Sequence, residues 1–294
     1  MIAYLILNYN STNDLKECIS SIEKNCKDYC IVVVDNGSKE DDAILAKQIC
    51  DDASAIFISS KDNLGFAKGN NLGFSYIRKN IKCDYIAMIN SDTIILDSSF
   101  EAKIDEAYSK YEFAVLGPDV LPAHSNPMMD ELDTLDKVKK RIQYVKRMQK
   151  ILNIPFVNIA YLLCGKVFGV INAIASDKKD FIEQDVLNCQ LHGCFLVFSN
   201  LYLEDSICDK TFLYGEEDIL TYECRKKRYV TLYYPEIKIQ HNESRATKKS
   251  VPNVIARKKF YYKHRMDSLY VLLDYFEREN RKWVSVKGSL ELNF

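Results

Sequence analysis

Three carboxylates stand side by side in the segment Tyr214-Gly215-Glu216-Glu217-Asp218. Negative charges this close raise one another's pKa, so we expect at least one of these carboxyls to bind its proton more tightly than an isolated one. A carboxylate of that kind suits general-base catalysis. The same cluster also fits a helix N-terminus, where acidic side chains complement the macrodipole without any chemistry. The segment therefore has a catalytic and a structural interpretation.

A further carboxylate ends the segment Asn90-Ser91-Asp92, which directly follows the apolar run at residues 85–89. A carboxylate at the end of a strand can hold a hard divalent cation that bridges a diphosphate. A turn or a helix cap explains the same residues without a metal. His241 follows the strand-like run 230–240 and suits a metal ligand or a phosphate contact, although a histidine at a strand end is often structural. His192, beside Gly193 in an apolar stretch, is open to the same two interpretations.

Two glycine-containing segments have the composition of nucleotide-binding loops. In Asp35-Asn36-Gly37-Ser38 the carboxylate could accept a hydrogen bond from a base or a ribose, and Gly37 allows a turn close to a ligand. Residues 63–71 (NLGFAKGNN) combine two glycines and a lysine at the start of a helix, a place that favours phosphate. Their spacing is neither that of a P-loop nor G-x-G-x-x-G. An ordinary turn and close helix packing are the structural alternatives.

The elements that must position these residues alternate between strand and helix. Apolar runs predict strands, and apolar residues at helical spacing predict helices; the strands are 2–7, 30–34, 55–58 and 85–89, and the helices are 13–24, 41–50 and 65–79. Such alternation indicates parallel strands with right-handed crossovers. Ligands of these sheets lie beyond the carboxyl ends of the strands. Polar clusters follow all four strands, at 8–10, 35–38, 62–63 and 90–92, and this coincidence indicates a nucleotide site.

In the second half of the chain, the sequence pattern predicts fewer regular elements. Residues 186–198 resemble a strand pair around Gly193, residues 212–228 hold a helix that the acidic cluster opens, and 230–240 is strand-like. A last helix covers 254–277, and its predicted apolar face consists of Met266, Leu269, Tyr270, Leu273 and Phe276.

A basic amphipathic helix is predicted at residues 137–150. Its basic residues favour contact with an anionic membrane surface, and the alternative is a basic-faced helix pair that covers the acceptor cleft. The basic residues are Lys137, Lys139, Lys140, Arg141, Lys146, Arg147 and Lys150. Residues 151–175 carry one charge, but Pro155 and several asparagines argue against a spanning helix.

Composition bounds the class of protein. The 294 residues are 47% hydrophobic and 28% charged, which is ordinary for a globular chain. The net charge of −1 gives no general attraction to nucleic acid, so we expect none as a partner. The ten cysteines form no C-x-x-C pair, and the N-terminal apolar run is short and lacks a basic leader. We therefore expect reduced thiols, no signal peptide and a cytoplasmic protein, with a peripheral position on the inner face of the cytoplasmic membrane as an option.

Six segments in order resemble the family 2 glycosyltransferases, in particular their rhamnosyltransferase-like branch of capsular and O-antigen polysaccharide synthesis. The segments are VVVDNGS (32–38), NLGFAKGNN (63–71), INSDT (89–93), HGCFLVF (192–198), FLYGEEDIL (212–220) and Gln240-His241. The resemblance implies an α/β GT-A fold over residues 1–245, with a helical insert at about 130–180 and a C-terminal helical extension at 246–294. It also implies inverting transfer from a nucleoside-diphosphate sugar, expected to be a UDP- or dTDP-sugar, with a divalent metal, Mn²⁺ or Mg²⁺. The acceptor would be a hydroxyl of a saccharide or a lipid-linked saccharide.

The resemblance also assigns roles to residues. Around the nucleoside and phosphates it places Asn8, Asn10, Asp35, Asn36, Asp62, Asn63, Gly65, Lys68 and Asn70. Asn90-Ser91-Asp92 stands at the metal motif, with Asp92 facing the metal and His241 flanking it, and His192 and Gly193 would lie where acceptor and donor meet. The base of the family comes from an acidic pair, which places Glu217 in that role, with Asp218 as the alternative and Glu216 beside them.

Two other functions compete with this one. A non-catalytic sugar-nucleotide binder or partner subunit would keep the pocket, but the acids at 92 and 216–218 argue against it. A nucleotidyltransferase shares a similar sheet but would need a basic, glycine-rich loop after the first strand, and residues 9–12 lack one.

Overall fold

The computed structural model describes residues 1–128, 134–154, 156, 181–242 and 253–290. The first part of the chain alternates as the sequence predicts, in the order β1 (Ile2–Asn8), α1 (Thr12–Asn25), β2 (Tyr29–Asn36), α2 (Glu40–Asp52), β3 (Ile56–Ser60), α3 (Phe66–Asn80) and β4 (Tyr85–Asn90). Three elements that the sequence analysis does not predict follow: β5 (Thr93–Ile95), α4 (Phe100–Tyr111) and β6 (Val115–Leu121). The second half contributes α5 (Leu135–Asn153), β7 (Val186–Leu187), β8 (Phe195–Ser199), α7 (Glu216–Lys227), β9 (Thr231–His241) and α9 (Val254–Leu290).

The described strands form one mixed sheet in the order β3-β2-β1-β4-β8-β6-β9-β5, and β7 adds to β9. β1 pairs in parallel with β2 and with β4, and β2 pairs in parallel with β3. β8 runs antiparallel between β4 and β6, and β6 and β9 are parallel again. The predicted fold class, a mostly parallel sheet flanked by helices, is confirmed.

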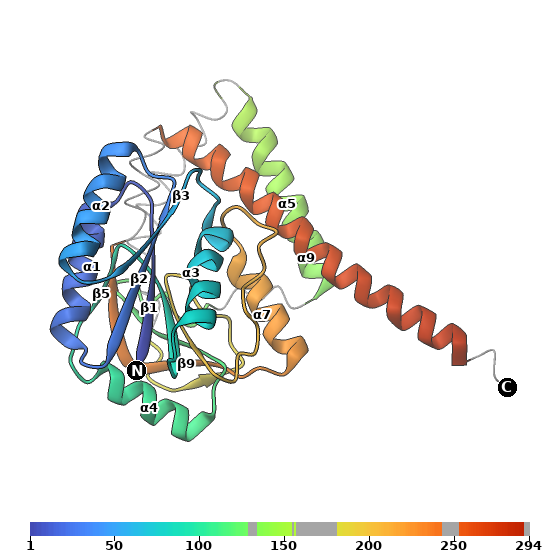
Figure 1. Cartoon of the computed structure of the whole chain (residues 1–294). Helices are drawn as coiled ribbons and strands as arrows, with labels where there is room; N and C mark the ends of the chain where they lie inside the picture. Colours follow the sequence, from blue (N-terminus) through green and yellow to red (C-terminus); the bar gives the residue numbers. More distant parts are fainter. Residues whose placement is uncertain (129–133, 155, 157–180, 243–252, 291–294) are drawn as a thin grey trace.

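Each face of the sheet is covered by its own helices, as Figure 1 shows. Successive residues of β1 alternate between the faces: Tyr4 and Ile6 pack against α1, α2 and α4, whereas Ala3 and Leu5 pack against α3. This alternation follows from the two-residue period of a strand. The two neighbouring strands β1 and β4 are therefore buried along almost their whole length.

The register brings the polar strand ends together. Asn8 at the end of β1 lies opposite Asp35 of β2, and Leu7 lies opposite Asn90 of β4. The prediction that these clusters share the carboxyl edge of the sheet is therefore confirmed.

The prediction of a strand pair around Gly193 is wrong. β7 pairs with β9, and β8 lies between β4 and β6. The intervening residues 188–194 lead from the start of β9, where β7 pairs, to the carboxyl edge of the sheet, where β8 begins beside the end of β4 and Gly193 lines a cavity.

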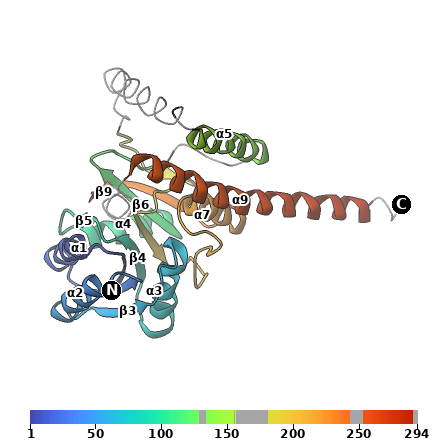
Figure 2. The same ribbon diagram turned by 90° about the horizontal axis from the view of Figure 1, so that it is seen from above.

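The basic helix α5 packs against α9 (Figure 2). A third apolar cluster joins the two helices to Ile219 of α7, and its α5 members are Val138, Ile142, Val145, Met148 and Leu152. The α9 side of this cluster includes Tyr262, Met266, Leu269 and Leu272, whereas Tyr270, predicted for the apolar face, is 44% exposed. The apolar face of α5 is therefore covered by protein, and its lysines face outward.

None of the helices that the structure describes combines the length and the apolar composition that a bilayer-spanning segment needs. Most of the predicted insert at 130–180 and the predicted domain boundary at 245 lie outside the described residues. Of the nine cysteines within the described ranges, six are buried.

The packing of α3 on the sheet yields a test. A Cβ on Gly73 would overlap Leu5 Cδ1 and lie 2.9 Å from Val34 Cγ2, both in the centre of the sheet. Alanine favours a helix over glycine by about 1 kcal/mol, but overpacking a core costs about 1–3 kcal/mol. Because the new Cβ would be too close to both side chains, we take an overpacking cost of about 2–3 kcal/mol, and after the helix gain we expect Gly73→Ala to lower the free energy of unfolding in urea by about 1–2 kcal/mol. The exposed Lys79→Ala on the same helix is the control, and a Gly73→Ala protein as stable as wild type would contradict this packing.

Candidate active site

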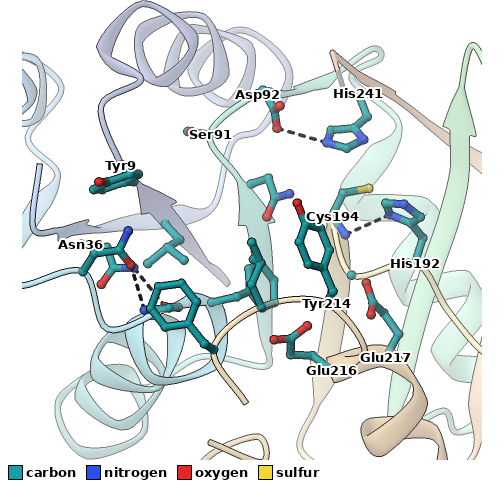
Figure 3. A pocket seen from close by; sticks show the side chains of 18 of the residues that line it. Tyr9, Asn36, Ser91, Asp92, His192, Cys194, Tyr214, Glu216, Glu217 and His241 are labelled. Atoms are coloured by element: carbon teal, nitrogen blue, oxygen red, sulfur yellow. Dashed lines mark hydrogen bonds and ion pairs between the residues drawn. The ribbon is translucent and has the colours of Figure 1, made fainter. Parts of the chain in front are cut away.

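A cavity of about 440 Å³ lies at the carboxyl edge of the parallel strands. This volume is within the range of small-molecule sites, about 300–1,000 Å³. Eleven residues that the sequence singled out line it: Asn36, Asn63, Gly65, Asn90, Ser91, Asp92, His192, Gly193, Glu216, Glu217 and His241. Figure 3 shows polar side chains from opposite ends of the chain facing this space.

One end of the cavity is formed by Asp92 and His241. The short strand β5 pairs antiparallel with the end of β9, so that Thr93 lies opposite His241. This pairing places Asp92 Oδ1 3.1 Å from His241 Nε2, and the two side chains are only 12% and 7% exposed. The Asn242 N–H also donates to the Asp92 carbonyl, at 3.0 Å.

These two residues fit a divalent cation. The other ring nitrogen of His241, Nδ1, is buried and has no hydrogen-bond partner among the described residues. A buried imidazole nitrogen without a partner is costly in a protein unless an ion or a water occupies it. A carboxylate and an imidazole are common ligands of catalytic metals.

The three adjacent acids on α7 meet three different environments. Glu216 is buried and accepts a hydrogen bond from Thr211 Oγ1 at 3.0 Å. Asp218 is also buried, forms an ion pair with Arg265 of α9 and accepts from Gln190 Nε2 at 2.7 Å. Asp218 lies outside the residues that line the cavity, whereas Glu216 and Glu217 are among them.

Glu217 is the most accessible of the three acids. Its carboxylate lies over Gly193, since a Cβ placed on that glycine would be 2.9 Å from Glu217 Oε1. A larger residue at 193 would displace the carboxylate. Gly193 therefore holds open the space that Glu217 occupies, which explains a glycine at this point of the cavity wall.

Burial sets the acidity of these groups. Burial, reinforced by the neighbouring Glu217, raises the pKa of Glu216 to about 7. Burial also raises the pKa of Asp218, although the Arg265 guanidinium opposes that rise. The expectation that at least one acid of the cluster has a raised pKa is consistent with both shifts, and desolvation is the larger cause.

The opposite end of the cavity is formed by an amide cradle. Asn36 Nδ2 donates to Asn63 Oδ1 at 3.2 Å and to the Gly65 carbonyl at 3.0 Å, and Asn36 Oδ1 accepts from the Leu64 N–H at 3.0 Å. The Phe66 N–H, at the start of α3, donates to the Phe212 carbonyl at 2.7 Å instead of facing the cavity. The cradle fixes the loop before α3 and leaves its polar atoms beside the ligand space.

Seven predicted residues lie outside the cavity lining: Asn8, Asn10, Asp35, Asp62, Lys68, Asn70 and Asp218. Asp35 is buried and accepts from Asn8 Nδ2 at 3.0 Å and from Ser38 Oγ at 2.6 Å. Asn70 donates back to the Phe66 carbonyl within α3. These contacts support the loops that carry the lining residues.

Asn10 ties the first loop to the second, because its N–H donates to Ser38 Oγ at 2.9 Å and its Oδ1 accepts from the Lys39 N–H. Asp62 and Lys68 are exposed. The nucleotide-binding roles predicted for all of these residues stay predictions.

Sequence reasoning missed several lining residues, notably Tyr9, Cys194, Tyr214 and Phe260. Tyr9 lies within a polar strand end, which was a usable signal. Phe260 comes from α9, and an aromatic residue on an amphipathic helix is indistinguishable from core in the sequence. Tyr214 packs edge-on against Phe260 at a ring distance of 6.4 Å, so the C-terminal helix helps to form the wall of the cavity.

The chain has a mixed α/β sheet with a cavity of acids, amides and imidazoles at its carboxyl edge. This is the arrangement found in α/β proteins that bind nucleotides. The chain belongs to glycosyl transferase family 2, whose family model matches residues 4–163. This match covers most of the parallel half of the sheet and ends before β8, α7 and β9.

Two curated proteins are similar to part of the chain. The rhamnosyltransferase WbbL of Escherichia coli K12 is 27% identical over 120 residues, which cover 40% of this chain and 44% of that protein. The low-salt glycan biosynthesis hexosyltransferase Agl10 of Haloferax volcanii is 26% identical over 130 residues, covering 43% of this chain and 39% of that protein. The matched region thus spans less than half the length of either relative.

Solved structures show that the fold is GT-A. Staphylococcus aureus TarS 1-349 aligns with a TM-score of 0.50 at 11% identity, over 91% of this chain and 70% of that one. The mannosyltransferase PcManGT of Pyrobaculum calidifontis, solved with GDP-Man and Mn²⁺, has a TM-score of 0.50 at 8% identity, over 99% and 80%. At these identities the likeness concerns the fold alone.

The buried Glu216 predicts a dependence of stability on pH. Folding raises its pKa from 4.5 to about 7, so the native state binds this proton more tightly than the unfolded chain does. That contribution is complete below pH 4.5 and is lost as the pH rises through about 7. We expect the unfolding free energy of wild type, minus that of Glu216→Gln, to fall by about 3 kcal/mol over this interval.

Urea denaturation at several pH values between 4.5 and 8 measures this difference. Glu236→Gln, at an exposed position of β9, is the matched control and should track wild type at every pH. A difference between wild type and Glu216→Gln that stays constant with pH would show that Glu216 titrates normally in the folded protein.

Proposed function

We propose that this glycosyltransferase moves a sugar from a UDP- or dTDP-sugar to a hydroxyl of a saccharide or lipid-linked saccharide, with inversion at the anomeric carbon. One observation carries the proposal: the Asp92–His241 pair and the Glu217 carboxylate face the same cavity from different walls (Figure 3). A displacement reaction needs a group that stabilises the leaving diphosphate and a base for the attacking hydroxyl, and this cavity offers both.

The donor would lie along the carboxyl edge of the sheet. The amide cradle of Asn36 and Asn63, with the ring of Tyr9, offers hydrogen bonds and a flat face to a nucleoside. The diphosphate would then extend to Asp92 and His241. A divalent ion held there, Mn²⁺ or Mg²⁺ by the usual preference of carboxylates, would supply charge neutralisation of the leaving group.

Glu217 is the residue we assign as the base. Asp218 is engaged by Arg265 and Gln190, and Glu216 is almost fully buried on Thr211, so neither can reach an acceptor without breaking its contacts. Glu217 takes the proton from the acceptor hydroxyl as the hydroxyl oxygen bonds to the anomeric carbon. The bond from that carbon to the diphosphate oxygen breaks on the opposite face, so the configuration inverts.

The acceptor proposal draws on the relatives and on α5. WbbL is a rhamnosyltransferase and Agl10 a hexosyltransferase of glycan biosynthesis, which supports rhamnosyl or hexosyl transfer in surface polysaccharide synthesis, such as capsule or O-antigen. The exposed lysines of α5 would bring the enzyme to an anionic membrane surface on its cytoplasmic side, where a lipid-linked acceptor resides. Because the apolar face of α5 is covered by α9, this contact would be electrostatic and peripheral.

The base assignment predicts a selective loss of turnover. We expect Glu217→Gln to slow the release of nucleoside diphosphate by about 10²–10⁴-fold, because the charge that accepts the proton is gone while the size is kept. Donor-induced thermal stabilisation should survive. The assay screens UDP- and dTDP-sugars with Mn²⁺, and the exposed Glu236→Gln is the control. Unchanged turnover in Glu217→Gln would remove the assignment, and donor binding without turnover in wild type would indicate a non-catalytic binder.

The cation assignment predicts a separate loss. Asp92→Asn keeps the shape of the side chain but removes its charge, and we expect Mn²⁺-dependent stabilisation by UDP to weaken by about 10–100-fold. Thermal unfolding at a series of Mn²⁺ concentrations measures the effect, with the exposed Asp52→Asn as control. If Asp92→Asn and wild type respond equally to Mn²⁺, Asp92 does not hold Mn²⁺ at this end of the cavity.

A further inference from the structure

The cation end of the cavity contains more than a carboxylate and an imidazole. Within the described residues, one ligand atom from each of His192, Cys194 and His241 lies within 4.8 Å of the others. Figure 3 shows these side chains gathered beside Asp92, away from Tyr9 and Asn36. Cys194 and His241 are buried, and all three residues line the cavity.

The contacts of His241 favour a metal in this cluster. Its Nε2 faces Asp92 Oδ1 at 3.1 Å, and its Nδ1 is the buried nitrogen without a hydrogen-bond partner in the described part of the chain. A histidine that binds a metal through one nitrogen usually donates its other N–H to a carboxylate, which fixes the tautomer and the ring. Here Asp92 is the carboxylate that accepts the N–H of His241 Nε2, which leaves Nδ1 available to an ion.

We infer that His192, Cys194 and His241 bind a borderline-soft dication of the Zn²⁺, Co²⁺ or Fe²⁺ class, with Asp92 orienting His241 and a fourth position open to the donor diphosphate. The inference rests on the proposed function and replaces the Mn²⁺ or Mg²⁺ proposed for its cation end with an ion of this class. Sulfur and imidazole donors select such ions over Mg²⁺ and Mn²⁺, which prefer oxygen. Three protein ligands and one open position are typical of catalytic rather than structural sites.

The geometry requires a small contraction. Metal–nitrogen and metal–sulfur bonds of a tetrahedral site put neighbouring ligand atoms roughly 3.3–3.6 Å apart. Each pair of the three atoms, now within 4.8 Å, therefore draws together by up to about 1.5 Å on binding. The 3.2 Å hydrogen bond from the Cys194 N–H to His192 Nδ1 holds the two ligands side by side, and ion binding replaces it.

Charge balance sets the number of protons that the protein releases when it binds the ion. The Cys194 side chain is 1% exposed, so a bare thiolate there would be expensive. Binding exchanges the thiol proton for the ion: the S–H bond breaks, a sulfur–metal bond forms and one proton leaves to the buffer. The resulting thiolate and the Asp92 carboxylate together offset the two positive charges of the ion.

Cobalt titration of the metal-free full-length protein tests this inference. We expect wild type to bind one Co²⁺ with the visible bands of tetrahedral coordination, a sulfur-to-cobalt charge-transfer band in the near ultraviolet and release of one proton. Cys194→Ser should lose the charge-transfer band and the proton release. Cys208→Ser, which changes a half-buried cysteine outside the cluster, should keep both. Equimolar Zn²⁺ should displace the cobalt, and a hundredfold excess of Mg²⁺ or Mn²⁺ should not.

Thermal unfolding without metal verifies that the Cys194→Ser protein is folded, and His241→Gln gives a second route to the same loss. A charge-transfer band that persists in Cys194→Ser, its absence from wild type, or displacement of cobalt by Mn²⁺ would each overturn the inference. The proposed function has a separate readout. Donor turnover that depends on Mn²⁺ and on Asp92 would support that function even if the cobalt signature were absent, and a cobalt signature in a protein that turns over no donor would stand without it.

Discussion

The pairing of β5 with the end of β9 is the contact on which the site depends. Three residues of β5 suffice to set His241 opposite Thr93, and so to bring Asp92 and His241 together although 149 positions separate them along the chain. α1 holds β5 in place, since Asn25 Nδ2 donates to the Ile95 carbonyl at 2.8 Å and Ser21 Oγ accepts from the Ile95 N–H at 3.1 Å. A strand this short would not hold its position alone. The cation end of the cavity therefore rests on a helix none of whose residues lines the cavity.

The opposite wall depends on the C-terminal half of the chain. α7 presents Glu216 and Glu217 to the cavity, and the ion pair between Asp218 and Arg265 fixes α9 against that helix. A buried pair of this kind specifies geometry more than it adds net stability. α9 in turn supplies Phe260 to the cavity wall and buries the apolar face of α5. Glu216, Glu217, His241 and α9 all follow the segment that the family model matches. The assignment of a base to α7 therefore rests on the geometry of this chain.

Much of the fold could be predicted because strand and helix periods are local properties. The first four strands and three helices lie within two residues of their predicted bounds, and the polar strand ends meet as parallel topology requires. The strand partners in the second half could not be predicted from local periodicity, because β8 pairs with β4 and β7 pairs with β9, and both partners are distant in the sequence. The pattern at 186–198 indicates two extended runs but does not encode their neighbours.

The site could be predicted in part for the same reason. Asp92, Glu217 and His241 follow or open regular elements, and such positions are visible in sequence. Asp35 and Asp218 have the same signature, yet their carboxylates are satisfied by Asn8 and Ser38 in one case and by Arg265 in the other. Only spatial contacts distinguish an acid that supports a loop from one that faces a ligand. Cys194 could not be predicted as a site residue, because a cysteine in an apolar run is typical of the hydrophobic core.

The central claim is that the cavity holds a nucleoside diphosphate with its phosphates at Asp92 and His241. A crystal structure of the full chain with UDP and a divalent cation tests it most directly. The account predicts the nucleoside beside Asn36 and Asn63, and the diphosphate in contact with an ion at the Asp92–His241 end. Density for the diphosphate at another surface of the sheet, with no ion at the Asp92–His241 end, would contradict it.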